Sequence, residues 1–153
     1  MSNTKNNMQE FIYEDKVMWA QLDANMHLRH SAYADFAAQA RLELLNHLGI
    51  DMGVFAALRI GPILFREELI YLKEVRLNDT IRMSCVLTRC RKDGSRWSFR
   101  QELFRGDGTR AAVINVDGAW IDHERRKLAK LPEHLVTQFL EIPKSDDFTE
   151  EAE

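Results

Sequence analysis

The spacing of apolar residues changes along this sequence, first following a helix and afterwards following strands. From Ser31 to Leu48, apolar residues recur at helical spacing, which places them on one face of a helix. The residues on this face are Tyr33, Phe36, Ala37, Ala40, Leu44 and Leu48. Ser31 can cap the start of the helix, and Gly49 can close its end. The rest of the chain therefore has to cover the apolar face of one long helix.

The second half of the chain has the pattern of strands alone. Four segments alternate apolar and polar residues, and short turn signals separate them, as in an antiparallel meander. The segments are residues 61–75, 79–92, 95–106 and 109–123, with turn signals at 78–79, 93–94 and 106–108. The residues that can face the helix are Ile81, Met83, Cys85 and Leu87 on one strand and Trp97, Phe99 and Leu103 on the next. Another strand is expected over residues 10–21.

These elements predict an α+β fold in which one antiparallel sheet packs on one main helix. Short helices are expected over residues 51–59 and 132–142, where Pro132 suits a first helical turn. The length of 153 residues fits one domain, which we expect over residues 1–143. Residues 144–153 are acidic and mostly polar, so we predict a disordered tail there.

Composition excludes several classes of protein. The formal net charge of -3 provides no broad basic surface for nucleic acid. No apolar run reaches the roughly 20 residues of a membrane span, and the polar N-terminus lacks a signal-peptide layout. We therefore expect a cytoplasmic protein that binds neither nucleic acid nor membrane. Cys85 and Cys90 lie at an odd separation on one predicted strand, so their side chains should leave opposite faces and stay reduced.

The common short motifs of catalysis and nucleotide binding are missing from the sequence. It has no G-x-S-x-G elbow, no Walker loop, no G-x-G-x-x-G and no paired CxxC. The sequence therefore gives no motif evidence for a serine hydrolase, a nucleotide-binding protein or a zinc ribbon. Attention falls instead on the segment QLDANMHLRH, residues 21–30, which lies between the first strand and the long helix.

Within this segment, Asp23, Asn25 and His27 occupy every second position. Two imidazoles and a carboxylate, from His27, His30 and Asp23, have a spacing that a metal site could use. No further ligand cluster accompanies them, so we expect no metal. Ordinary structural roles are also open, because aspartate and asparagine shape turns and a histidine can hold a loop to backbone carbonyls.

The run VMWAQLDANMHLRHSAYADFAAQARLELL resembles the N-terminal signature of hot-dog-fold acyl-CoA thioesterases of the 4-hydroxybenzoyl-CoA thioesterase type. Trp19, Asp23 and Tyr33 are in step with that family's strand-end aromatic residue, loop aspartate and N-x-x-Y stretch. The D-x-N-x-H order is also similar to a loop of plant acyl-carrier-protein thioesterases. Further on, IYLKEVRLNDTI resembles the family's Y-L-x-P-V-x-x-G-D strand, and KLAKLPEHL resembles its closing R-x-x-P-L-P-E segment. The resemblance covers residues 10 to 135.

The sequence departs from the family pattern at three places. Arg29 and His30 stand where many members have two asparagines, and Glu74 replaces the usual proline. The acid often found in the family's helix, in E-E-x-R, is missing before Arg41. A helix-borne catalytic glutamate, used by another branch of the fold, would have to be Glu43, and we do not expect it to act.

The resemblance implies a hot-dog fold, an antiparallel sheet of about five strands wrapped around one long central helix. It also implies hydrolysis of an acyl-CoA or acyl-carrier-protein thioester without a cofactor. Asp23 is the expected catalytic residue, and Asn25 and His27 are its helpers. The substrate contacts expected around them are His30, Ser31, Tyr33 and Glu74, although Tyr33 also suits a core position and Glu74 a solvated strand end.

The chemistry of thioester hydrolysis agrees with a single carboxylate. A thiol has a pKa of about 8.5, so the leaving group needs little protonation. Free N–H groups at the start of the long helix could stabilise the oxyanion. Asp23 could attack the carbonyl itself or activate a water molecule, and the second role requires burial that raises its pKa from about 3.9. The sequence leaves both roles open.

Assembly and two rival functions complete these expectations. One helix on one sheet leaves open sheet edges, so self-association is expected. The resemblance implies a homodimer or tetramer with the acyl site at the subunit interface. The first rival is a non-catalytic acyl-CoA or lipid-binding regulator of the same fold. The second is a hydratase or dehydratase, for which the usual His-to-Pro-Gly arrangement is missing.

Overall fold

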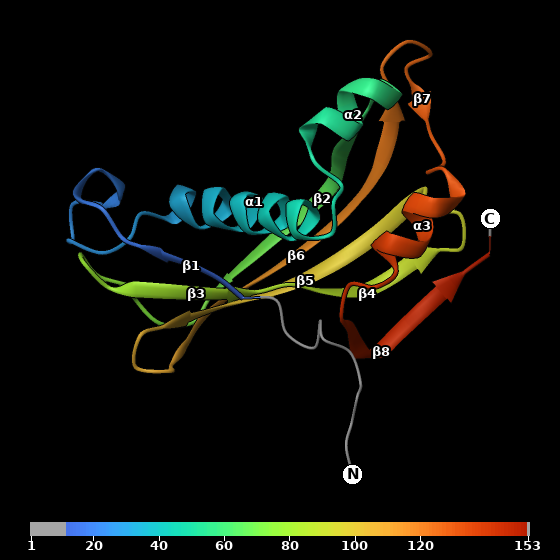
Figure 1. The fold of residues 1–153 in the computed structure, drawn as a ribbon. Helices are drawn as coiled ribbons and strands as arrows, with labels where there is room; N and C mark the ends of the chain where they lie inside the picture. Colours follow the sequence, from blue (N-terminus) through green and yellow to red (C-terminus); the bar gives the residue numbers. More distant parts are fainter. Residues whose placement is uncertain (1–11, 153) are drawn as a thin grey trace.

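In the computed structural model, which describes residues 12–152, a curled sheet wraps around the long helix α1 (Figure 1). The helices are α1 (His30–His47), α2 (Met52–Leu58) and α3 (Glu133–Phe139). The strands are β1 (Ile12–Lys16), β2 (Ile60–Tyr71), β3 (Thr80–Ser84), β4 (Val86–Arg91), β5 (Arg96–Arg105), β6 (Arg110–Asp122), β7 (Lys127–Leu128) and β8 (Lys144–Glu151). A short 3-10 helix, η1 (Trp19–Gln21), precedes α1. The predicted long helix and both short helices are therefore confirmed.

The eight strands form one sheet, in which β4, β5 and β6 pair in chain order as the predicted meander requires. The meander prediction is wrong for the first strand of the series, because β2 pairs with β6 and not with the next strand, β3. β5 is central: β3 and β4 pair with it on one side and β6 on the other, all antiparallel. β1 and β8 lie outside β3 and β4, and β2 lies outside β6. The short β7 pairs with the end of β6. The number of strands exceeds the expected five because β3 and β4 lie end to end along the same side of β5, and β1 and β8 lie outside them in the same way.

Two predicted strands are shorter than the sequence pattern indicated. The segment 79–92 divides at Cys85 into β3 and β4. The first strand ends at Lys16, and η1 occupies residues 19–21, where an extended strand was predicted. Residues 10 and 11 lie outside the described part of the chain.

The predicted disordered tail is wrong for residues 144–151, which form β8. This strand pairs in parallel with β4, with Arg89 opposite Thr149. Acidic residues of β8 meet arginines on the sheet: Arg89 binds Glu151 at 3.2 Å, and Arg100 binds Asp147 at 3.7 Å. Composition suggested disorder because the tail's partners lie far away in the sequence.

The two cysteines do not leave opposite faces of the sheet, as the strand pattern predicted. The register of β4 shifts between Leu87 and Arg89, so one extra residue turns the following side chains over. Cys85 and Cys90 are consequently both buried in the core. Both are free thiols, and burial raises the pKa of each to about 12. Their reactivity toward oxidants is low for this reason.

The core lies between α1 and the sheet, where the predicted apolar faces meet. All six residues predicted on the helix face are buried, and so are the inward residues of β3 and β5. The small alanines of α1 let the helix lie close to the sheet, and larger apolar side chains complete the core. No helix among residues 12–152 has the length and apolar character needed to cross a bilayer.

Gly118 gives a test of this packing. It lies opposite Trp97 across β5 and β6, and a Cβ atom on it would overlap the Trp97 ring and approach the Ile63 carbonyl oxygen. Gly118→Ala is expected to lower the free energy of unfolding by about 3 kcal/mol because of this overlap. The control is Gly106→Ala, whose Cβ would make an ordinary 3.5 Å contact with the Thr80 carbonyl oxygen. Urea unfolding measures both, and equal stabilities of the two variants would contradict the prediction.

Candidate active site

The loop between η1 and α1 folds back on itself around Asp23. The Asp23 N–H donates to the His27 carbonyl oxygen at 2.8 Å, and the Met26 N–H donates to the Asp23 carbonyl oxygen at 3.0 Å. Leu22 and Leu28 pair across the base of this loop. Met26 has a φ of 64°, which a tight reversal of this kind requires. Local hydrogen bonds therefore fix the loop.

The Asp23 carboxylate is part of this loop and is also exposed. Its Oδ1 accepts the N–H groups of Asn25 at 2.8 Å and of His27 at 3.1 Å. These bonds lower the pKa of Asp23, with the His27 N–H as the largest cause. The carboxylate is therefore ionised at neutral pH. Among the described residues, its Oδ2 has no hydrogen-bond partner.

The sequence allowed either Asp23 or Asn25 to stabilise the turn through its side chain. In the structure the Asp23 side chain does so. Asn25 contributes its backbone N–H, and its side chain is exposed. His27 is half-buried, and its backbone pairs with Arg76, while the Leu28 N–H donates to the Val75 carbonyl oxygen at 2.6 Å. The loop is thus attached to the segment that follows β2.

That segment carries Glu74, the residue that replaces the family's proline. Its carboxylate accepts a hydrogen bond from Arg76 at 3.2 Å. Its pKa is lowered, first by its own backbone N–H and then by Arg76, with a smaller contribution from His27. Glu74 is exposed, as expected for a solvated residue at a strand end. It also lies within electrostatic reach of His27.

The start of α1 offers free backbone N–H groups beside the loop. Arg29 is the N-cap, and its carbonyl oxygen accepts the Ala32 N–H at 3.0 Å. The predicted capping by Ser31 is wrong, because Ser31 lies inside the first turn and its Oγ accepts a bond from Arg29 Nε at 3.0 Å. Among residues 12–152, the N–H groups of His30 and Ser31 have no backbone acceptor. They are available to a ligand oxygen.

Two tyrosines connect the end of β2 to this helix start. Tyr33 is buried, and its ring meets Tyr71 edge to face with centroids 5.0 Å apart. The Tyr71 hydroxyl donates to the His30 carbonyl oxygen at 3.3 Å. Burial raises the pKa of Tyr33, and the charges of Asp23 and Glu74 add to this effect. The sequence did not predict Tyr71 as a site residue. The feature of the sequence that could have indicated it is an aromatic residue in a predicted strand.

The predicted site residues are thus partly gathered. Asp23, His27, Tyr33 and Glu74 lie within electrostatic reach of one another near the start of α1, which His30 and Ser31 form. Tyr33 is buried and His27 is half-buried, whereas the other predicted site residues are exposed. No group of three or more metal-binding side chains occurs among residues 12–152, so Asp23, His27 and His30 do not form a ligand cluster.

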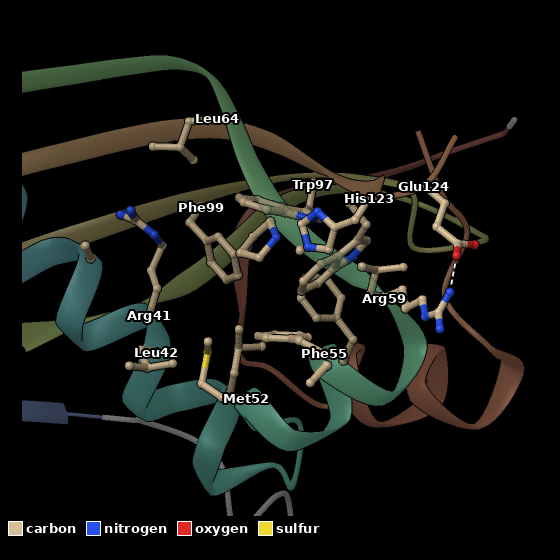
Figure 2. A pocket seen from close by; sticks show the side chains of 18 residues that line it. Arg41, Leu42, Met52, Phe55, Arg59, Leu64, Trp97, Phe99, His123 and Glu124 are labelled. Atoms are coloured by element: carbon tan, nitrogen blue, oxygen red, sulfur yellow. Dashed lines mark hydrogen bonds and ion pairs between the residues drawn. The ribbon is translucent and has the colours of Figure 1, made fainter. Parts of the chain in front are cut away.

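A large cavity lies at the other end of α1, and the sequence did not predict it. Its volume is about 700 Å³, and it is bounded by α1, α2 and the ends of β2 and β6. Figure 2 shows Met52 and Phe55 of α2 on one side of the cavity and Trp97, Phe99 and His123 on the other. The inward positions of Trp97 and Phe99 were predicted, but an empty space beside them was not.

The loop of Asp23 and the cavity are far apart within one chain. The cavity is lined by β2 residues from Ile60 to Leu64, whereas Tyr71, at the far end of β2, contacts the start of α1. In an extended strand, Leu64 and Tyr71 lie roughly 23 Å apart, and Ile60 lies farther still from Tyr71. Figure 1 likewise shows the loop at one end of α1 and α2 at the other. Asp23 therefore does not reach the cavity of its own chain.

Comparison with known proteins identifies the family. Residues 17–139 match the model of the thioesterase-like superfamily. The chain belongs to this superfamily. As a thioesterase-like protein it is a thioester hydrolase, and the predicted hot-dog fold is confirmed. No functionally curated protein matches the sequence.

Solved structures share the fold of this thioesterase-like chain at low sequence identity. A hypothetical protein from Staphylococcus aureus in complex with CoA has a TM-score of 0.83 and 22% identity, covering 91% of this chain and 86% of its own. A 1,4-dihydroxy-2-naphthoyl-CoA thioesterase from Synechocystis has a TM-score of 0.76 and 16% identity, covering 86% and 96%. A DHNA-CoA thioesterase from Staphylococcus aureus has a TM-score of 0.77 and 18% identity, covering 86% and 90%.

Proposed function

We propose that the chain is an acyl-CoA thioesterase in which Asp23 attacks the thioester carbonyl. The observation that carries this proposal is the ionised Asp23 carboxylate beside the free N–H groups at the start of α1. CoA as the thiol part is supported by the similar Staphylococcus aureus protein, whose structure holds CoA. A location in the cytoplasm is part of the proposal, and the two free thiols agree with it.

Asp23 acts as a nucleophile rather than as a general base in this proposal. A general base would need a raised pKa, but the N–H groups of His27 and Asn25 lower the pKa of Asp23, and these bonds lie within its own loop. Attack by Oδ2 on the carbonyl carbon gives a tetrahedral oxyanion, which the N–H groups of His30 and Ser31 can stabilise. Loss of the CoA thiolate leaves a mixed anhydride, and water then cleaves it to the free acid and the Asp23 carboxylate. His27 and Asn25 hold Asp23 through their N–H groups.

A symmetric dimer through β2 would complete the site. β2 pairs with β6 on one side, and its other edge has no strand partner among the described residues. Exposed apolar side chains gather along it and just beyond it: Leu64, Phe65, Ile70, Tyr71 and Leu72. A free edge of this kind favours pairing with a second strand.

Antiparallel pairing of two β2 strands has a direct consequence for catalysis. Two-fold symmetry would place the start of β2 in one subunit beside the end of β2 in its partner. The start of β2 lines the cavity, and its end contacts the helix start near Asp23. Asp23 of one subunit would then face the cavity of the other, which would hold the acyl group. The single chain separates these parts, so the dimer is a functional requirement of the proposal.

Thiol release tests the proposed reaction. The purified protein is expected to release CoA thiol from members of a panel of short, long and aromatic acyl-CoAs, detected with a thiol-reactive dye. The cysteines contribute little background because both are buried. The rival regulator would bind acyl-CoA without release. Binding of acyl-CoA with no thiol release across the panel would contradict the proposed function and favour the regulator.

A further inference from the structure

Arg41 is a cation held at the wall of the apolar cavity. It extends from α1 one turn after Ala38, and Figure 2 shows it at one end of the cavity. Its Nη1 donates to Gln101 Oε1 at 2.8 Å. Gln101 is fully buried, and its side-chain amide donates to the Ala37 carbonyl oxygen at 3.0 Å. A rigid buried amide therefore fixes the position of the guanidinium.

Arg41 forms no direct ion pair among the described residues, although the more distant Glu67 partly stabilises its charge. Burial has the largest effect on the pKa of Arg41 and lowers it. A guanidinium has five N–H donors, and Gln101 accepts one bond. Glu124 is the acid among the described residues that line the cavity, and it pairs with Arg59 at the opposite end (Figure 2). No direct ion pair therefore compensates the charge of Arg41 at its end of the cavity, although Glu67 offsets part of it.

Two tryptophans in the cavity wall have buried indole N–H groups without acceptors. Trp97 and Trp120 both line it, with 4% and 0% of their surfaces exposed. Among residues 12–152, neither Nε1 atom has a hydrogen-bond partner. Each unsatisfied buried donor costs about 1–3 kcal/mol. Because neither nitrogen is accessible to water, the two indoles present carbon atoms to the cavity and form part of its apolar wall.

We infer that the cavity selects acyl groups that carry a free carboxylate, which Arg41 binds while the aromatic side chains enclose the apolar part. This inference rests on the proposed function and names the substrate class of that site. The cavity volume of about 700 Å³ is in the range of small-molecule sites. A carboxylate accepts the guanidinium fork with two parallel bonds, and a low-dielectric surrounding strengthens them. The positive charge of Arg41 favours a carboxylate over a neutral oxygen group.

A matched pair of substrates tests the inference on the unmodified protein. Octanoyl-CoA and 7-carboxyheptanoyl-CoA have the same number of acyl carbons and differ in the terminal carboxylate. The protein is expected to hydrolyse the carboxylated substrate with a kcat/KM about 10-fold or more above that of octanoyl-CoA. Equal values, or a preference for octanoyl-CoA, would overturn the inference while leaving the proposed function intact.

Variants of Arg41 locate the origin of that preference. Arg41→Met is expected to lower kcat/KM for the carboxylated substrate about 10- to 100-fold and to leave octanoyl-CoA within about threefold. Arg41→Lys should retain part of the preference because it keeps the charge. The control is Arg110→Met, which removes an arginine that pairs with Glu102 and does not line the cavity, and it should leave the preference unchanged. An equal loss for both substrates in Arg41→Met and Arg41→Lys would indicate a structural role and overturn the inference.

Binding of the free acids separates this inference from the proposed function. Trp97 and Trp120 in the cavity wall report occupancy by a change in fluorescence, and Trp19→Phe removes the signal of an exposed tryptophan. Octanedioate is expected to bind at least about 10-fold more tightly than 1,8-octanediol, which has no carboxylate, and Arg41→Met should abolish the difference. If this holds in a protein that releases no thiol, the cavity assignment stands and the enzymatic proposal fails. Equal binding of the acid and the diol would overturn the cavity assignment.

Discussion

Asp23→Asn is expected to lower kcat about 10² to 10⁴-fold, with the fold retained. The asparagine Oδ1 can still accept the N–H groups of Asn25 and His27, so the loop keeps its hydrogen bonds. What the variant loses is the negative charge and nucleophilicity of the second oxygen. Single-turnover and steady-state measurements of CoA release, together with circular dichroism, check activity and fold.

Asp107→Asn is the matched control for this variant. Asp107 is also an exposed aspartate whose Oδ1 accepts the N–H of the residue two positions on, Thr109, at 2.9 Å. It lies in the turn between β5 and β6, and the same charge is removed there. We expect activity within about twofold of the parent protein. Equal activity of Asp23→Asn and Asp107→Asn would remove Asp23 from the mechanism.

The pH dependence of the reaction follows from the direction of the Asp23 pKa. The folded loop lowers the pKa of Asp23 below its ordinary value of 3.8. The reactive carboxylate is therefore fully present above pH 3.8, and it is lost only when the pH falls through the lowered pKa of the folded protein. Between about pH 5 and pH 8, kcat/KM should show no decrease that is due to protonation of Asp23. Substrate binding is measured separately at each pH. If activity falls with decreasing pH in this range while binding does not change, a general base with a raised pKa is favoured.

Mixing two inactive variants is expected to restore activity if the site spans two subunits. Ala56→Trp places a large side chain at an exposed position of the cavity lining, and it should lower activity about 100-fold by displacing the acyl group. A mixed dimer with Asp23→Asn would contain one site with an intact Asp23 and an open cavity. Random exchange of subunits should therefore return about a quarter of the parent activity.

The design of the mixing experiment distinguishes a shared site from a site within one chain. If Asp23 acted on its own cavity, the mixed dimer would have no complete site and the mixture would stay inactive. Ala57→Trp is the control for bulk, because Ala57 is also exposed on α2 but does not line the cavity. It should remain active alone. Sedimentation velocity on each sample checks that the subunits pair.

The helix and strand pattern was readable from the sequence because it depends on neighbouring residues. The apolar face from Tyr33 to Leu48 has helical spacing, and the inward residues of β3 and β5 alternate. Loop features at Asp23 were equally local, since its hydrogen bonds reach residues two and four positions on. The resemblance to the family rested on the same segment and led to the correct fold.

Features that depend on distant residues were not readable. β8 was predicted as disordered because its arginine partners, such as Arg89, lie far away along the chain. The alternation of side chains predicted that Cys90 faces away from the core, but it assumes a regular strand. The bulge in β4 turns Cys90 toward the core instead. The pairing of Tyr33 with Tyr71 joins a helix to a strand end that no local pattern relates.

By itself, the sequence determined the long helix, the strands that cover it and the hydrogen-bonded turn of Asp23, because backbone geometry and side-chain period act over a few residues. Only the tertiary structure decided where space remains empty and which polar groups stay unpaired. The cavity and the Arg41 side chain in its wall, which forms no direct ion pair, arise where α1, α2 and three strands meet. Such a place is defined by the volumes that side chains from distant segments fail to fill, and no single stretch of sequence contains that information.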